Sequence, residues 1–164
     1  TTFYGDWILY RSGVFSKEQY TQELETTLRR HFENTDNASQ SLLESSYDLW
    51  LDGYEAVVPD RKVSVYHKGA VAALILQELF QKSTKSLDDL MKLLWLKFGK
   101  TNIGYTYEDY QKCCEEILGE NLFEYFDEVI AGNKSLFGQT QKALERLAFL
   151  MTKNENGYLI LEDI

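Results

Sequence analysis

The sequence predicts an all-α fold, an irregular array of about six to seven helices in a single domain of residues 1–164. Apolar residues recur at helical spacing along most of the chain, and most of these segments have a capping residue before them and a glycine after them. One proline and ten glycines leave little room for long linkers. With 44% hydrophobic and 14% aromatic residues, the chain can bury a core of its own.

Three helices are expected in the first half of the chain. Residues 16–32 open with Ser16 and Gln19, the pattern of a capping box. Residues 41–53 place apolar side chains on one side and are expected to stop near Gly53; these side chains are Leu42, Leu43, Tyr47, Trp50 and Leu51. Residues 65–82 are apolar nearly all round, which predicts a central helix enclosed by the others.

The second half predicts three or four further helices. In residues 86–99 the expected inward stripe is Leu87, Leu90, Met91, Leu94, Trp95 and Phe98. Residues 106–119 and 121–132 each begin at a capping residue and end at a glycine, with a very short turn between them. A last helix is expected from residue 140 to Met151, and residues 157–161 are the one candidate for a strand.

Charge and hydropathy exclude two classes of partner. The net charge of -9 repels phosphate, and no basic stripe offsets it, so we expect no nucleic acid. The longest apolar run, residues 70–76, is far shorter than the ~20 residues that span a bilayer, so we expect no membrane segment. Cys113 and Cys114 are adjacent and favour buried thiols over an ordinary disulfide.

A complete catalytic site cannot be assembled from these residues. A zinc peptidase needs H-E-x-x-H, but His31 and His67 are followed by Phe32 and Lys68, so each is interpreted as a surface or partly packed side chain. The acidic pairs at 88–89, 115–116 and 162–163 are interpreted as solvated. The chain itself is therefore expected to hold no metal or other cofactor.

Residues 152–163 have glycine at the sixth position of a calcium loop. Such a loop needs Asp first and Glu twelfth, whereas this chain has Thr152 and Asp163. Asn156 and Gly157 are better explained as a tight turn.

A polar cluster, Val63-Ser64-Val65-Tyr66-His67-Lys68-Gly69-Ala70, stands at the start of the most apolar helix. Its Tyr-x-Lys-Gly pattern resembles the gluzincin zinc metallopeptidases, and more specifically the glycyl aminopeptidase family. Other segments resemble that family in the same order: residues 1–6, 11–13, 41–51, 86–99, 104–109 and 126–132. Together they cover residues 1–133.

The resemblance implies a role for one residue. Tyr66 would be the transition-state tyrosine, whose hydroxyl donates to the oxyanion formed when zinc-bound water attacks a peptide carbonyl. A phenol with a pKa near ~10 is protonated at neutral pH and suits this role. Without the family, Tyr66 is explained as a packed helix-end residue, Lys68 stays open between function and solvation, and Gly69 is expected to allow a close backbone approach.

The resemblance also implies zinc for a parent enzyme that releases N-terminal glycine or alanine, with the metal ligands just upstream of Thr1. The expected partners are then the rest of that peptidase and a peptide substrate, and this part would be inactive alone. The chain opens without methionine or a signal-type segment, which fits a part of a longer protein. Either a cytoplasmic or an exported location is compatible with the sequence.

Two points depart from this interpretation. After Asn133 the family usually continues into a PDZ module, whereas residues 134–164 predict a helical extension with a turn and a tail. The alternative hypothesis is a stand-alone helical protein-interaction module that never contains a zinc site.

Overall fold

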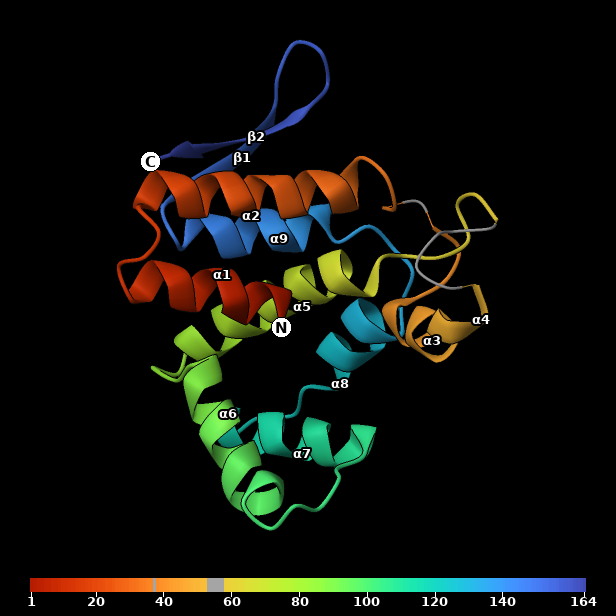
Figure 1. The fold of residues 1–164 in the computed structure, drawn as a ribbon, viewed down its shortest axis with the longest axis vertical. Helices are drawn as coiled ribbons and strands as arrows, with labels where there is room; N and C mark the ends of the chain where they lie inside the picture. Colours follow the sequence, from red (N-terminus) through yellow and green to blue (C-terminus); the bar gives the residue numbers. More distant parts are fainter. Residues whose placement is uncertain (37, 53–57) are drawn as a thin grey trace.

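The computed structural model describes residues 1–36, 38–52 and 58–164, and it is mostly helical (Figure 1). The elements of the first half are α1 (Thr2–Arg11), α2 (Lys17–Phe32), α3 (Leu42–Tyr47), α4 (Leu49–Asp52) and α5 (Val65–Gln81). The elements of the second half are α6 (Leu87–Leu94), η1 (Trp95–Gly99), α7 (Tyr107–Leu118), α8 (Phe123–Tyr125), η2 (Phe126–Ile130), α9 (Phe137–Glu145), β1 (Phe149–Lys153) and β2 (Leu159–Asp163). The all-α prediction is confirmed, with one small sheet at the C-terminal end.

Helix α5 is the centre of the fold, as its all-round apolar sequence predicts. It packs against α1, α2, α3, α6, α7 and α9, and Leu74, Leu76 and Phe80 along it are fully buried. Two hydrogen bonds fix its neighbours. The Tyr125 hydroxyl donates to the Ala72 carbonyl at 3.0 Å, and the Leu87 amide donates to the buried Gln77 side chain at 2.9 Å.

Capping residues set the helix starts where the sequence places them. Ser16, Ser41 and Thr106 each accept a hydrogen bond from the amide three residues later, in capping boxes at α2, α3 and α7. Gly119 ends α7 in the left-handed conformation, with φ of 79°. The predicted stop at Gly53 lies outside the described residues.

Helix α1 was not expected from the sequence. Its aromatic side chains pack on α2, where the Tyr10 and Tyr20 rings stack with centroids 4.9 Å apart and Trp7 lies 5.7 Å from Tyr20. Phe3, Trp7 and Tyr10 recur at helical spacing, so the signal for this helix was present.

Two predicted apolar faces are partly wrong. On α6 the buried stripe is Leu87, Leu90 and Leu94, whereas Met91 is half-exposed and Trp95 is 62% exposed. On α3 and α4, Tyr47 and Trp50 are each 78% exposed. Helical spacing alone predicted too many buried side chains on each face, because no neighbouring element among the described residues covers these four.

Wide helical turns end two of the predicted helices. The Lys100 amide donates to the Trp95 carbonyl, and the Ala131 amide donates to the Phe126 carbonyl, both across five residues. The helix expected over 121–132 is therefore the short α8 followed by the π-helical turn η2. Gly132 follows that turn because a Cβ there would collide with the Glu128 carbonyl oxygen.

The secondary structure predicted for the C-terminal segment differs most from the structure. Helix α9 ends at Glu145, Ala148 adopts a positive φ of 62°, and Met151 lies in β1 rather than in a helix. Strands β1 and β2 form an antiparallel hairpin, so the single predicted strand has a partner. The predicted tight turn is confirmed: Gly157 has a φ of 81°, and its amide donates to the Asn154 carbonyl at 2.8 Å.

Helix α2 covers part of the hairpin. The Leu159 amide donates to Glu33 at 2.8 Å and the Leu161 amide to Glu25 at 2.9 Å. These carboxylates satisfy backbone donors that the strand would otherwise leave unpaired. The hairpin therefore closes the end of the core formed by α2 and α9 (Figure 1).

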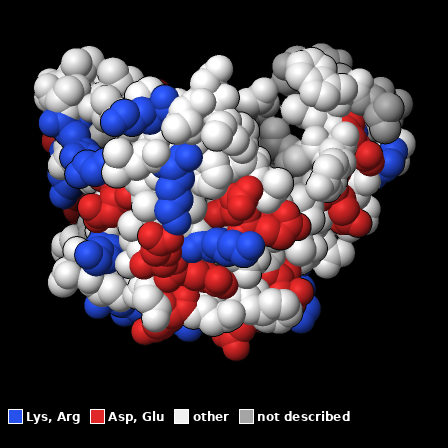
Figure 2. Space-filling model, turned by 90° about the horizontal axis from the view of Figure 1, so that it is seen from below, with Lys and Arg blue, Asp and Glu red and all other residues white. Residues whose placement is uncertain are grey.

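The surface carries charges of both signs. Figure 2 shows acidic side chains gathered near the middle of one face, with basic side chains among and beside them. Asp88 is not simply solvated, because it accepts from the Arg11 guanidinium at 2.6 Å and from the Tyr4 hydroxyl at 2.8 Å. Within the described residues, no helix is long and apolar enough to cross a bilayer.

Candidate functional site at the N-terminus of α5

Tyr66 lies in the first turn of α5, directly after its capping residue. The Ser64 hydroxyl accepts a hydrogen bond from the His67 amide at 3.3 Å, and so fixes where the helix begins. The Tyr66 side chain is 46% exposed, although the helix becomes almost fully buried from Ala70 onward. The first turn of α5 therefore places a phenol at the surface, although most of the helix is buried.

Lys68 anchors the same turn from beneath. It is only 2% exposed, and its ammonium donates to the Gly132 carbonyl at 3.2 Å. Burial lowers the pKa of Lys68, while the Asp36 carboxylate acts in the opposite direction. The question left open by the sequence is thus answered, because Lys68 is a buried anchor and not a solvated charge.

Three loops that are distant in the sequence meet around this anchor. The Ser135 hydroxyl donates to Asp36 at 2.6 Å, and the Asn133 side chain donates to the Ser39 carbonyl at 3.0 Å. The Ser39 amide donates in turn to the Asp60 carbonyl at 2.9 Å. These hydrogen bonds hold the segment next to Gly132, whose carbonyl is the acceptor for Lys68 in the first turn of α5.

Comparisons with known proteins agree with the resemblance. Residues 1–72, which include Tyr66, match the family model of the M61 glycyl aminopeptidases. A solved structure, an aminopeptidase N family protein from Idiomarina loihiensis, superposes with a TM-score of 0.82 at 26% sequence identity over 93% of this chain. Over residues 1–72 the chain is therefore similar to the M61 glycyl aminopeptidases, and its fold is similar to that of an aminopeptidase N family protein.

The superposition includes most of this chain but only part of the Idiomarina protein. This chain covers 27% of the length of the Idiomarina protein, so it corresponds to about a quarter of that chain. No curated protein matches this sequence significantly.

His31 is more deeply buried than the sequence indicates. It is 1% exposed, and Nδ1 lies 3.1 Å from the Thr35 hydroxyl. Nε2 lies 3.9 Å from Asp36 and has no hydrogen-bond partner among the residues that the structure describes. Burial lowers the pKa of His31 to about 4, so the imidazole is neutral at neutral pH. The interpretation of His31 as a surface or partly packed residue is wrong, whereas His67 is half-buried as expected.

The described residues do not form a zinc site. Among the described residues there is no group of three His, Cys, Asp or Glu side chains that could hold a metal ion. The imidazole of His31 is enclosed and its Nδ1 is engaged by Thr35. In the candidate calcium segment, the Asn154 side-chain oxygen accepts from the Asn156 and Tyr158 amides, so it closes a turn.

The close backbone approach that the sequence predicts at Gly69 is found at Gly132 instead. A Cβ added at Gly69 would meet nothing within 4 Å among the described residues, so the expected close backbone approach at Gly69 is wrong. At Gly132 a Cβ would collide with backbone, and the Gly132 carbonyl is the acceptor for Lys68. Sequence reasoning missed Gly132 as part of the site, and a charged Lys68 before a long apolar run was the signal for a buried partner.

Cys113 and Cys114 are both buried free thiols, in agreement with the sequence. Burial raises the pKa of Cys114 to about 12 and also raises that of Cys113. Neither thiol is therefore a nucleophile at neutral pH.

Proposed function

We propose that this chain forms the helical wall of the active-site cleft in a zinc aminopeptidase that releases N-terminal glycine or alanine. Tyr66 supplies a hydrogen bond to the transition state. One observation carries the proposal: within the segment matched to the M61 family, Tyr66 is half-exposed on a turn whose neighbours Ser64 and Lys68 are both fixed.

Tyr66 would act as a preorganised donor. When water adds to a peptide carbonyl, negative charge develops on the carbonyl oxygen, and a donor already in place stabilises that charge without reorganising. The Lys68 bond to Gly132 and the Ser64 cap hold the backbone on both sides of Tyr66.

The metal ligands in this proposal come from outside these 164 residues. The sequence contains no H-E-x-x-H, and the described side chains do not form a zinc site. The chain alone is therefore proposed to be inactive, with the remainder of the peptidase and a peptide substrate as its partners.

The test is Tyr66→Phe in the complete peptidase. The variant keeps the ring and removes one hydroxyl, so kcat should fall about 10²–10³-fold while KM, zinc content and thermal stability stay nearly unchanged. Tyr158→Phe is the matched control, because Tyr158 is also half-exposed but lies on the hairpin turn, and a phenylalanine there keeps its contact with Arg29. Near-normal turnover of Tyr66→Phe would make Tyr66 a packing residue.

A second candidate function is a helical protein-interaction module. The high exposure of Tyr47 and Trp50 favours it, since exposed aromatic side chains are common in binding surfaces. The open reading frame distinguishes the two functions. An H-E-x-x-H segment shortly before Thr1 supports the peptidase, and a start codon at Thr1 supports the module.

A further inference from the structure

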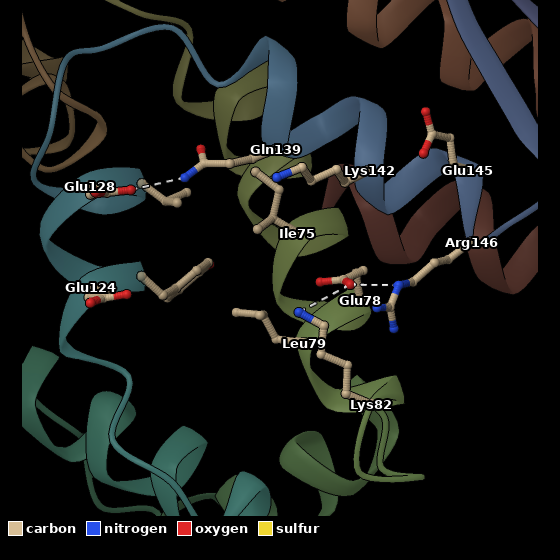
Figure 3. Close-up of a pocket in the computed structure, with 12 residues that line it drawn as sticks. Ile75, Glu78, Leu79, Lys82, Glu124, Glu128, Gln139, Lys142, Glu145 and Arg146 are labelled. Carbon is tan, nitrogen blue, oxygen red and sulfur yellow. Dashed lines mark hydrogen bonds and ion pairs between the residues drawn. The ribbon is translucent and has the colours of Figure 1, made fainter.

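A cavity of about 540 Å³ lies beside the C-terminal half of α5 (Figure 3). Tyr66 lies at the N-terminal end of the same helix. The apolar floor of the cavity consists of Ile75, Leu79, Tyr125 and Val129, contributed by α5, α8 and η2. The lining begins nine residues after Tyr66, which corresponds to about 13 Å along the helix axis. This cavity is separate from the candidate site, and its volume is within the range of about 300–1,000 Å³ that is typical of small-ligand sites.

The two walls of the cavity differ in charge. One wall, from α8 and η2, carries Glu124 and Glu128. In Figure 3 these two carboxylates lie on one side. Across the cavity lie Lys142 of α9, Arg146 directly after α9 and Lys82 directly after α5.

The basic side keeps a positive excess after its internal ion pairs are counted. Glu78 accepts from Arg146 at 2.9 Å and pairs with Lys82 at 3.3 Å, so one carboxylate is shared by two cations. Glu145 also belongs to this wall, but in Figure 3 its carboxylate points away from the acidic wall. No ion pair is found for Lys142 or Glu124 within the described part of the chain.

We propose that this cavity binds a short peptide with a free amino terminus, a free carboxyl terminus and an apolar side chain. The ammonium group would face Glu124 and Glu128, of which Glu128 also accepts a hydrogen bond from Gln139 at 3.0 Å. The carboxylate would face Lys142 and Arg146, and the side chain would cover Ile75 and Leu79. A simple amine or a simple carboxylate would satisfy only one wall. The opposite charges across an apolar floor complement a zwitterion whose charged ends are separated by apolar surface.

This inference does not depend on the catalytic role of Tyr66. Binding at the cavity would be measured on this chain, without any turnover. A failure here leaves the proposed peptidase function untouched, and a failure of Tyr66→Phe leaves this binding site untouched.

The probe is the tripeptide alanyl-leucyl-alanine, titrated into the isotope-labelled chain and followed by amide chemical shifts. We expect a dissociation constant of about 0.1–1 mM, as its size allows, with the shifted amides on α5, α8 and α9. The N-acetylated and C-amidated forms of the same tripeptide should each bind several-fold more weakly, because each loses one charge.

Charge variants locate the site. Lys142→Glu should weaken binding roughly tenfold, because it replaces an attraction with a repulsion. Lys134→Glu, which makes the same charge change at an exposed residue outside the cavity, should leave binding unchanged. Glu124→Gln and Glu120→Gln form the corresponding pair for the acidic wall.

A third variant tests the cavity itself. Leu79→Trp fills the floor with a larger side chain and should abolish binding, while the amide spectrum away from the cavity is retained. The proposal is overturned if the tripeptide does not bind, if the shifted amides lie elsewhere, or if the acetylated and amidated forms bind as well as the free tripeptide. Equal binding by Lys142→Glu and Lys134→Glu would overturn it as well.

Discussion

The first turn of α5 combines an exposed phenol with a buried ammonium two residues later. Helical geometry separates the two side chains by about 200° around the axis, so one can face outward while the other faces the core. The sequence could place both residues at the start of a buried helix. It could not identify the partner of Lys68, because the acceptor, the Gly132 carbonyl, is 64 residues away in the chain.

His31 provides a prediction about pH at the residue scale. Its folded pKa of about 4 lies below the ordinary value of 6.5, mainly because burial disfavours the charged imidazolium. Between these pH values the unfolded chain binds a proton that the folded chain excludes. Stability from this residue is therefore complete above pH 6.5 and is lost as the pH falls towards 4.

Urea unfolding of the wild type and of His31→Gln from pH 7 to pH 4 measures this effect. The wild type should lose up to about 3 kcal/mol more than the variant over that interval. Other titrating groups are common to both proteins and cancel in the difference. Parallel pH profiles for the two proteins would show that His31 is protonated equally in the folded and unfolded states.

At the scale of elements, local signals were predictive where the interactions are local. The capping boxes at Ser16, Ser41 and Thr106 require only residues three positions apart, and all three form. The all-round apolar pattern of α5 likewise needs no knowledge of its neighbours. These signals placed the starts of α2, α3, α5 and α7 to within a residue or two.

The wrong predictions concern segments whose structure depends on contacts with residues distant in the sequence. Residues 146–151 have helical spacing, but Phe149 and Met151 gain strand partners in Asp163 and Leu161, and pairing with residues further along the chain outweighed local propensity. The wide turns η1 and η2 shift the phase of the side chains that follow, which a fixed period cannot anticipate. The exposed Trp95 belongs to such a turn.

The capping box of α2 gives a prediction at this scale. In Ser16→Ala the Gln19 amide loses its acceptor, which lies at 3.2 Å in the folded protein. The free energy of unfolding should fall by about 1 kcal/mol, within a range of about 0.5–2 kcal/mol. Chemical denaturation measures the change. Gln22→Ala, at an exposed position in the same helix, is the control and should change the free energy of unfolding by less than about 0.5 kcal/mol. Equal losses in both variants would contradict a stabilising role of the Ser16 cap.

At the scale of the whole molecule, the sequence anticipated the class of fold, which the structure confirms. The M61 match over residues 1–72 and the structural likeness support the resemblance to the aminopeptidases. The position of Tyr66 at the mouth of α5 also followed from the sequence. The hydrogen bonds around Lys68 did not, because Asp36, Ser39, Gly132 and Ser135 come together only through tertiary packing.

The isolated chain is expected to retain no stoichiometric zinc. A zinc site needs three protein ligands in addition to an open position, and the described residues offer no such group. Metal analysis after dialysis from zinc-containing buffer tests this, with thermal unfolding as a second readout, since a bound metal would raise Tm. One tightly held zinc ion per chain would contradict the proposal that the ligands lie outside it.

The central claim is that Tyr66 meets the developing oxyanion. The most direct measurement is a crystal structure of the complete peptidase with a phosphonate analogue of the tetrahedral intermediate. We predict that the Tyr66 hydroxyl lies about 2.7–3.1 Å from the phosphonyl oxygen that occupies the oxyanion position. A hydroxyl more than about 3.5 Å from every oxygen of the analogue, beyond hydrogen-bonding range, would contradict the account.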